Sequence, residues 1–153
     1  MLIEVKAKVA WIIDGKVRKR LETYIIDKEV FAEAEYAVMT TLSNAVNEGS
    51  ADSFEIQGLK ISPIKEIVTQ YSGDYTFIVA LRDIMLQDDG SEKTIKYKVL
   101  LWADSITEAM TYAREIAQQG YDMQIDSLKE VSYTYLNSEE NETSTEDRVT
   151  GEA

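Results

Sequence analysis

The side chains of this chain that could do chemistry are mainly carboxylates. The 153-residue sequence has no cysteine and no histidine, so it lacks thiolate nucleophiles, thiolate metal ligands and the commonest general base. Asp88, Asp89 and Glu92 cluster at a predicted turn, and carboxylate oxygens are ligands for hard cations. Their spacing lacks the order of a calcium-binding loop. A solvated turn is therefore the preferred interpretation.

Paired carboxylates could act as general acid and base only inside a cleft that raises one pKa. Asp122 and Asp126 form one such pair, and Glu33 and Glu108 hold equivalent places in two similar halves. The sequence predicts no cleft around either pair, no glycine-rich phosphate loop and no serine with a histidine base. We therefore expect no enzyme activity, no catalytic residue, no metal site and no cofactor.

One short segment concentrates positive charge just after a predicted hairpin turn. Its cations are Lys16, Arg18, Lys19 and Arg20. At the tip of a protruding hairpin they could contact phosphate or another partner. The simpler alternative is a charged, solvated strand that resists edge-to-edge association. These four residues are the candidate interaction site.

The overall charge opposes binding to nucleic acid. The chain has 16 basic and 28 acidic residues, giving a net charge of −12. Residues 1–26 hold six basic and three acidic side chains, so the remainder carries ten basic and 25 acidic ones. Such a field repels phosphate backbones and anionic membranes and favours basic partners or solubility. We predict no nucleic-acid binding tighter than about 10 μM at physiological salt.

Several aromatic residues lie on or near predicted strands, where three interpretations apply. They are Tyr24, Tyr71, Tyr75, Phe77, Tyr97, Tyr133 and Tyr135. Packing on a sheet is preferred, a protein interface is the second interpretation, and stacking on bases is the third because it needs a positive groove.

Periodicity predicts two strands and a helix in the first half. Apolar residues alternate over residues 3–13, as in a half-buried strand, and Asp14-Gly15 suits a type I′ turn before a strand over 16–26. Three- and four-residue steps over 30–46 predict an amphipathic helix ended by Gly49. A third strand follows over 54–61.

The second half has the same order. Alternation predicts a hairpin whose turn is 88–91, and Ser105 with Glu108 has the spacing of a capping box at the start of a helix. The stripe predicted to be buried on that helix is Ile106, Ala109, Met110, Ala113, Ile116 and Ala117. Residues 123–136 are predicted as one last strand, whereas 64–71 is ambiguous between strand and helical turn.

The two halves can be aligned directly. Asp14-Gly15 and Asp89-Gly90 lie 75 residues apart, and Leu59-Lys60 and Leu128-Lys129 lie 69 apart. We therefore predict an α+β fold of two tandem ββαβ repeats, about 2–68 and 75–136, with one helix per repeat packed on antiparallel sheet. Residues 1–136 would form a single domain. Residues 137–153, with six acidic side chains and one arginine, are predicted as a disordered tail dispensable for folding.

Each half has the same pattern where a strand ends and the helix begins. The segments are Ile26-Asp27 with Phe31-Ala32-Glu33-Ala34, and Trp102-Ala103-Asp104 with Ile106-Thr107-Glu108-Ala109. This pattern resembles that of an uncharacterised family of short duplicated proteins from gut anaerobic bacteria and their bacteriophages. The resemblance covers roughly residues 2–136. Val30 departs from the polar cap of the pattern, and Ile106 replaces its phenylalanine. The family implies no activity, so no functional residue is carried over.

These observations predict a non-catalytic protein-interaction or accessory protein, such as a phage-encoded factor acting on a host or virion protein. The alternatives are a nucleic-acid-associated protein that uses the basic hairpin at 16–20, and an acidic mimic of nucleic acid. Self-association through sheet edges is a further expectation. With no apolar run of about 18 residues and no signal-peptide pattern, the expected location is the bacterial host cytoplasm or the virion.

Overall fold

The computed structural model describes residues 1–120 and 122–137, which form eight strands and two helices. They divide into two compact units, one containing Met1–Ser62 and the segment from Tyr133 onward, the other Pro63–Ser132. The predicted α+β class is confirmed. A single domain over 1–136 stays a prediction, and residues 138–153 of the predicted tail lie outside the described residues. No helix in the described ranges is long and apolar enough to cross a membrane.

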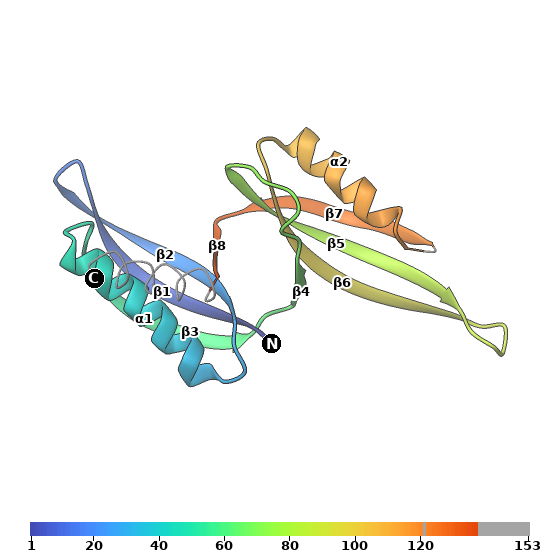
Figure 1. Ribbon diagram of the computed structural model, residues 1–153, viewed down its shortest axis with the longest axis horizontal. Helices are drawn as coiled ribbons and strands as arrows, with labels where there is room; N and C mark the ends of the chain where they lie inside the picture. Colours follow the sequence, from blue (N-terminus) through green and yellow to red (C-terminus); the bar gives the residue numbers. More distant parts are fainter. Residues whose placement is uncertain (121, 138–153) are drawn as a thin grey trace, which may run out of the picture. The chain divides into compact units, whose positions relative to one another are not determined.

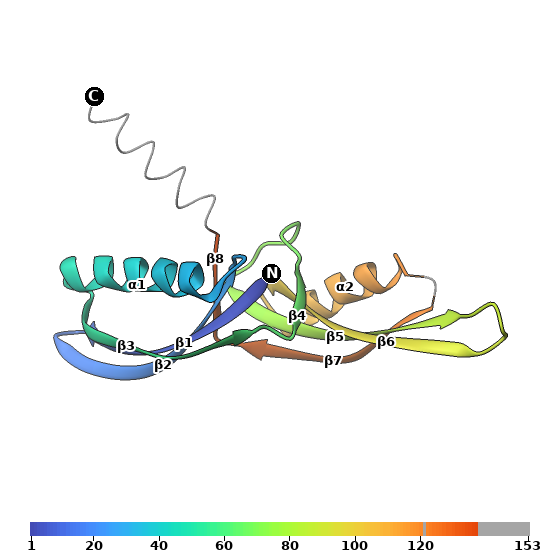
Figure 2. The same ribbon diagram turned by 90° about the horizontal axis from the view of Figure 1, so that it is seen from below.

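The first unit is a four-stranded sheet with one helix on it (Figures 1 and 2). Its strands lie in the order β3-β1-β2-β8. Its elements are β1 (Leu2–Ile13), β2 (Lys16–Asp27), α1 (Phe31–Asn47), β3 (Ala51–Ile61) and β8 (Tyr133–Leu136). β1 pairs antiparallel with β2 and β3, whereas β8 pairs parallel with β2.

Local chemistry explains the turns of this unit. Asp14 and Gly15 have φ of 52° and 76°, which a type I′ turn requires at both central residues, so the predicted turn is confirmed. Gly49, also at positive φ, lets the chain leave α1, and the amide of Ser50 donates to the carbonyl of Ala45 at 2.9 Å. The predicted helix end is thus confirmed.

The helix-facing side of the first sheet is its core. Alternate residues of β1 and β2 face α1, which buries Ala34, Val38 and Leu42 against them. The fully buried residues of the two strands include Ile3, Val5, Ala7, Val9 and Ile26. The alternating pattern in the sequence therefore identifies the buried face correctly.

The second unit repeats this arrangement, and its strands lie in the order β4-β6-β5-β7. Its elements are β4 (Ile64–Ile67), β5 (Tyr75–Leu86), β6 (Glu92–Ala103), α2 (Ile106–Ala117) and β7 (Met123–Val131). Helix α2 lies on one face (Figure 2). Its core includes Phe77, Val79, Leu81, Val99 and Leu101.

The predicted capping box at α2 is present in a modified form. Ser105 Oγ accepts a hydrogen bond from the amide of Glu108 at 3.1 Å. The Glu108 carboxylate accepts from the amide of Asp104 at 3.4 Å, one residue earlier than in the usual box. At α1 the cap residue, Val30, makes no such side-chain bond.

The prediction that Ile106 is buried is wrong. Ile106 is 60% exposed, and its equivalent Phe31 is 44% exposed. Each is the first residue of its helix, and a helical side chain points back toward the helix N-terminus. Both side chains therefore project past the helix instead of over the sheet. The stripe is buried from the next turn onward, at Ala109, Ala113 and Ile116.

Strand registers show how closely the two units correspond. Val5 pairs with Leu59, and Val79 pairs with Leu128. A β-bulge then follows at the same point in each unit, between Lys6 and Ala7 opposite β3 and between Ala80 and Leu81 opposite β7. Shared irregularities of this kind support the predicted repeat more strongly than shared side-chain classes do.

The prediction of a single last strand over 123–136 is wrong in one respect, because this segment forms two strands that belong to two different sheets. β7 pairs with β5 in the second unit, whereas β8, after Ser132, pairs parallel with β2 in the first. β4, which follows the third strand of the first repeat, likewise pairs parallel with β6 of the second unit. Each repeat thus supplies the fourth strand of the sheet built by the other, and neither sheet is purely antiparallel.

The opposite face of the first sheet carries a buried charge. Glu4 on β1 is 3% exposed, and its Oε2 lies 3.3 Å from Lys60 Nζ on β3. Tyr133, the first residue of β8, lies close to this carboxylate. Burial, together with the Glu4 carboxylate, raises the pKa of Tyr133. The second unit has apolar Ile78 and Ile64 at the places of Glu4 and Tyr133.

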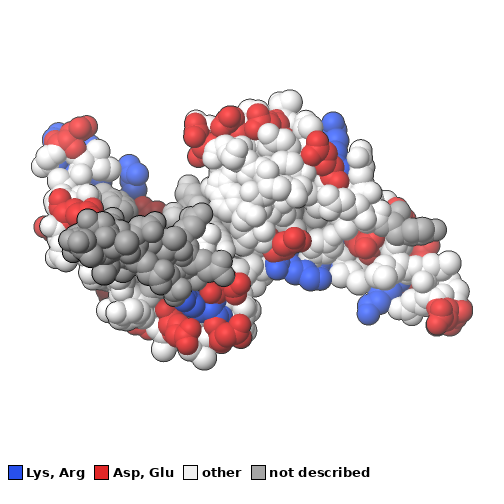
Figure 3. Space-filling model, viewed as in Figure 1, with Lys and Arg blue, Asp and Glu red and all other residues white. Residues whose placement is uncertain are grey.

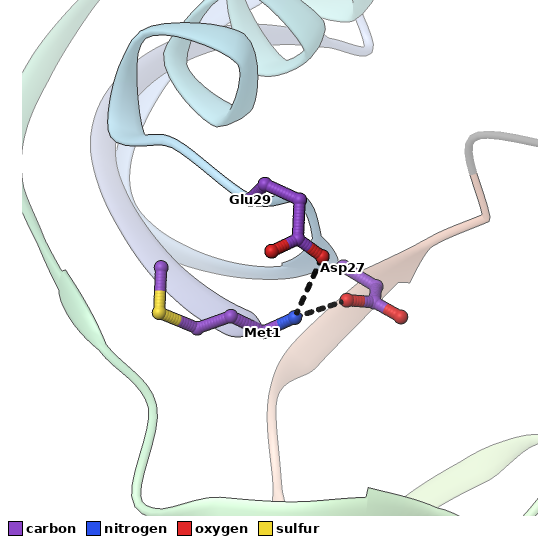
Figure 4. A network of polar contacts seen from close by, with 3 residues as sticks. All are labelled: Met1, Asp27 and Glu29. Carbon is purple, nitrogen blue, oxygen red and sulfur yellow. Dashed lines mark hydrogen bonds and ion pairs between the residues drawn. The ribbon is translucent and has the colours of Figure 1, made fainter.

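Figure 4 shows the amino group of Met1 between two carboxylates. It lies 2.7 Å from Asp27 Oδ1 and 3.8 Å from Glu29 Oε1. The hydrogen bond to Asp27 raises the pKa of this amino group above 8.0. The contact joins the start of β1 to the end of β2, where Leu2 pairs with Asp27.

Candidate functional site

The four predicted interaction residues lie on β2, but on two faces of the sheet. In the β1–β2 register, the paired residues are Lys16 and Ile13, Arg18 and Trp11, Lys19 and Ala10, and Arg20 and Val9. Since side chains alternate along a strand, three of the cations share the face that α1 covers, and Lys19 lies on the other. The period of two was visible in the sequence and could have predicted this split.

None of these cations is neutralised by a neighbour. All four are exposed, and within residues 1–120 and 122–137 none of them forms an ion pair or a side-chain hydrogen bond. In Figure 3 the tip of the β1–β2 hairpin shows both colours, whereas the tip of the β5–β6 hairpin is red. The first hairpin is therefore a local positive site on an acidic protein.

The outer edge of β2 is half open. β2 pairs with β1 along its whole length, but with β8 only from Thr23 to Ile26. Among the described residues no strand covers the segment from Lys16 to Glu22 on that side, which we term the open edge. Val17 and Leu21 on this segment are 53% and 64% exposed. A long, partly apolar free edge is a template for pairing with another strand.

The hairpin geometry identifies which backbone groups are free. Beside a two-residue turn the flanking pair, here Ile13 and Lys16, exchanges hydrogen bonds, and every second pair along the ladder does the same. The intervening residues of β2 turn their N–H and C=O groups outward. On the open edge these are Val17, Lys19 and Leu21. The amide of Ile12 donates away from β2, to Ser50 O at 2.9 Å, in agreement with this phase.

A groove of about 600 Å³ lies beside the open edge, within the first unit. Its lining is contributed by the β1–β2 hairpin, the C-terminal half of α1, the connection from α1 to β3, and β8. The residues are Trp11, Ile12, Ile13, Arg20, Glu22, Tyr24, Thr41, Leu42, Ala45, Ser50, Thr134 and Leu136. The groove is thus largely apolar with one cation, Arg20, and one carboxylate, Glu22.

The polar groups of the groove are partly fixed. Trp11 Nε1 donates to Glu22 Oε1 at 2.8 Å, which holds the carboxylate against the indole. Thr41 Oγ1 donates to the carbonyl of Ala37 at 3.0 Å. Burial raises the pKa of Tyr24 to about 12, and the charge of Glu22 adds to this effect.

The pKa of Tyr24 predicts a loss of stability at high pH. The folded state holds the phenolic proton more tightly than the unfolded state, where the pKa is 10.0. Stability therefore falls as the pH rises from 10 to 12, by about 1.4 kcal/mol at pH 11. Urea unfolding at pH 9 and pH 11 measures this loss, which should be smaller by about that amount in Tyr24→Phe. Equal losses in both proteins would contradict the assignment.

The corresponding region of the second unit is built differently. Tyr97 stands at the place of Glu22, and Lys65 Nζ lies 5.1 Å from the centre of its ring. Tyr71 stacks on Tyr112 of α2 with ring centres 4.1 Å apart and donates to Glu115 at 2.8 Å. This tyrosine therefore packs on a helix instead of the sheet. The Trp11–Glu22 groove belongs to the first unit alone among the described residues.

Three of the seven carboxylates that the sequence singled out have structural partners. Asp89 accepts hydrogen bonds from the amide and hydroxyl of Ser91 in the second turn, and these lower its pKa. Glu108 accepts from Tyr112 at 2.8 Å, and Asp126 lies 3.5 Å from Arg82 Nε. In the part of the chain that the structure describes, no three metal-binding side chains form a group.

Sequence reasoning missed the groove because its walls come from distant segments. Trp11 and Glu22 are eleven residues apart, and the hairpin register places them on one face of the sheet but opposite Arg18 and Ala7. Their contact is therefore diagonal and depends on how the two side chains extend. Leu42 and Leu136 join them only because α1 packs on the sheet and β8 adds to it. No local pattern predicts that second step.

Comparison with known proteins gives a family match. A family model described as a domain of unknown function, DUF4494, matches residues 3–146. No curated protein and no solved structure matches the chain. The match spans both units and all eight described strands except the first residue of β1. The chain therefore belongs to the DUF4494 family of domains of unknown function.

Proposed function

We propose that this protein is a non-catalytic interaction module that binds another protein by adding the partner's strand to the open edge of β2. The proposal rests on the half-covered edge of β2. Within residues 1–120 and 122–137, β8 fills four positions of this edge and no strand covers Lys16 to Glu22. Strand addition uses the backbone groups of a free edge for affinity and the pockets beside it for specificity. The groove along α1 supplies such a pocket.

The groups that would serve this role are already aligned. Val17, Lys19 and Leu21 turn their backbone N–H and C=O groups outward, and β1 holds the other side of the strand rigidly in place. Little backbone ordering would be required on binding, which favours affinity. The resemblance to proteins of gut bacteria and bacteriophages makes a host or virion protein, met in the cytoplasm or the virion, the first partner class to screen.

The test is selection of peptides from a displayed library of random twelve-residue sequences on the immobilised, full-length protein. Selected peptides should bind the wild type and slow hydrogen exchange at the amides of Val17, Lys19 and Leu21. Lys19→Pro removes one outward N–H while leaving the bonds to β1 intact, since proline is tolerated on an edge. Binding should then fall by at least about tenfold, the equivalent of one lost backbone hydrogen bond.

Lys19→Ala is the matched control, because it removes the same charge and keeps the amide. It should bind the selected peptides within about threefold of the wild type. Peptides that bind equally well to wild type and Lys19→Pro, or that protect amides elsewhere, would refute strand addition at β2. Oligonucleotides that bind more tightly than any selected peptide would favour the nucleic-acid alternative instead.

A further inference from the structure

We infer that the partner strand is acidic at every second position and carries one large apolar side chain for the groove. This inference rests on the proposed function and names the chemistry of the occupant. It follows from the spacing of Lys16, Arg18 and Arg20, from their lack of partners in the described residues, and from the lining of the groove.

The charge pattern selects an alternating acidic sequence. Lys16, Arg18 and Arg20 occupy successive positions on one face of β2, and Lys19 stands alone on the other. A strand added beside β2 places every second side chain on that same face, about 5 Å from its cross-strand neighbour. Three carboxylates at alternate positions of the added strand would therefore each meet one cation of the row. Carboxylates at the intervening positions would lie on the other face, where Lys19 is the one cation of this segment.

The groove selects the apolar anchor. Arg20 belongs both to the row of cations and to the lining of the groove, and Trp11 and Ile13 on β1 also bring the groove alongside that row. Along β2 the groove continues past Arg20 to Glu22 and Tyr24. Trp11, Tyr24 and Leu136 offer it an apolar surface, with the indole N–H already bound to Glu22. A bulky apolar residue two positions beyond the last carboxylate lies on the same face and would reach this surface. Burial of its apolar area there favours binding.

Charge complementarity chooses this occupant over a second copy or a nucleic acid. The segment from Gly15 to Leu21 has four cations and no acid, whereas the rest of the chain is strongly acidic. Nucleic acid would meet that surrounding negative field. An acidic strand confined to the open edge would contact the positive site without covering the acidic surface.

Fluorescence anisotropy with labelled heptapeptides tests the inference on the full-length protein. In the in-phase peptide, three glutamates and one phenylalanine occupy every second position, on the face of the cation row, and threonine occupies the positions between them. Two versions are made, with the phenylalanine at one end or the other, because the peptide can add to β2 in either strand direction. One matched peptide has glutamine for each glutamate, and another has alanine for phenylalanine. Lys19→Pro, Lys19→Ala and the double variant Arg18→Gln/Arg20→Gln are compared with the wild type.

The in-phase acidic peptide should bind about tenfold more tightly than its glutamine counterpart, as expected from a few cross-strand ion pairs. Arg18→Gln/Arg20→Gln should abolish that difference, and replacement of phenylalanine should weaken binding by about tenfold. Lys19→Pro should weaken every peptide, whereas Lys19→Ala should leave the in-phase preference unchanged.

Failure of the inference and failure of the proposed function give different results. Equal binding of glutamate and glutamine peptides, still lost in Lys19→Pro, would refute the acidic partner and keep strand addition. Acidic binding that survives Lys19→Pro would refute both, because simple charge attraction would explain it. If the peptides bind only to a protein truncated after Asn137, residues 138–153 are the occupant of the open edge. If sedimentation shows dimers that the peptides do not dissociate, a second copy of the chain is the occupant. Either result would overturn the inference.

Discussion

Phe77→Ala should lower the free energy of unfolding of the second unit by about 3–5 kcal/mol, the usual cost of removing a buried aromatic ring. Phe77 is 1% exposed and lies in the core formed by β5, β6 and α2. Its neighbours include Val79, Val99 and Leu101 on a sheet held from both sides, so the space cannot close fully. A cavity cost is therefore added to the loss of apolar burial.

Urea unfolding followed by hydrogen exchange measures this loss separately for the two units. Amides of β5 and β6 should report the full effect. The matched control is Phe31→Ala, since Phe31 is 44% exposed at the start of α1 and should cost less than about 1 kcal/mol. A loss below about 1 kcal/mol for Phe77→Ala, or equal losses for the two variants, would contradict the assigned core.

Tyr133→Phe should lower the stability of the first unit by about 2 kcal/mol and loosen β8. The tyrosine lies close to Glu4, whose carboxylate is 3% exposed, and its hydroxyl is a polar group that helps to solvate this buried charge. Removing a polar group from beside a buried charge costs about 1–3 kcal/mol, because the charge is left poorly solvated. Lys60 is 60% exposed, so it compensates for only part of the loss.

The equivalent residues of the second unit suggest a double substitution that tests whether Glu4 and Tyr133 act together. It has Ile78 and Ile64 at the places of Glu4 and Tyr133. Replacing a buried polar pair by apolar residues is often close to neutral, so Glu4→Ile/Tyr133→Ile should be more stable than Tyr133→Ile alone by more than about 1 kcal/mol. Additive losses would show that the two side chains do not act together.

Tyr36→Phe is the control for the loss of a hydroxyl, because Tyr36 lies on α1 of the same unit and is 73% exposed. Its stability should remain within about 0.5 kcal/mol of the wild type. Hydrogen exchange at the amides of β8 distinguishes a loosened strand from general destabilisation. Faster exchange confined to β8 and to Thr23–Ile26 is the expected pattern for Tyr133→Phe.

The pairing of Glu4 with Tyr133 also bears on which fourth strand joins which sheet. If β4 took the place of β8, Ile64 would lie where Tyr133 lies beside Glu4, and the buried carboxylate would lose that polar neighbour. Such a mismatch costs more than an apolar contact gains. A buried polar pair thus favours the observed exchange of strands over its alternative, much as single polar residues fix register in other assemblies.

The amino-acid sequence specifies the local elements, because their signals act between near neighbours. Asp14-Gly15 has the φ preferences of its turn, Ser105 caps α2, and alternation from Ile3 to Ile13 identifies the buried face of β1. It also shows that the chain has two similar halves, since the spacing between the turn, the strand end and the helix start is the same in both. The positions of the four cations along β2 follow from the same alternation.

Tertiary structure alone decided the site. β4 and β8 have four residues each and pair parallel with strands far along the chain, and a segment this short has no periodicity that could name its partner. Because β8 is short, no strand among the described residues covers Lys16 to Glu22. The packing of α1 brings Leu42 beside Trp11. The open edge and its groove therefore arise from long-range pairing, which depends on contacts that no local pattern encodes.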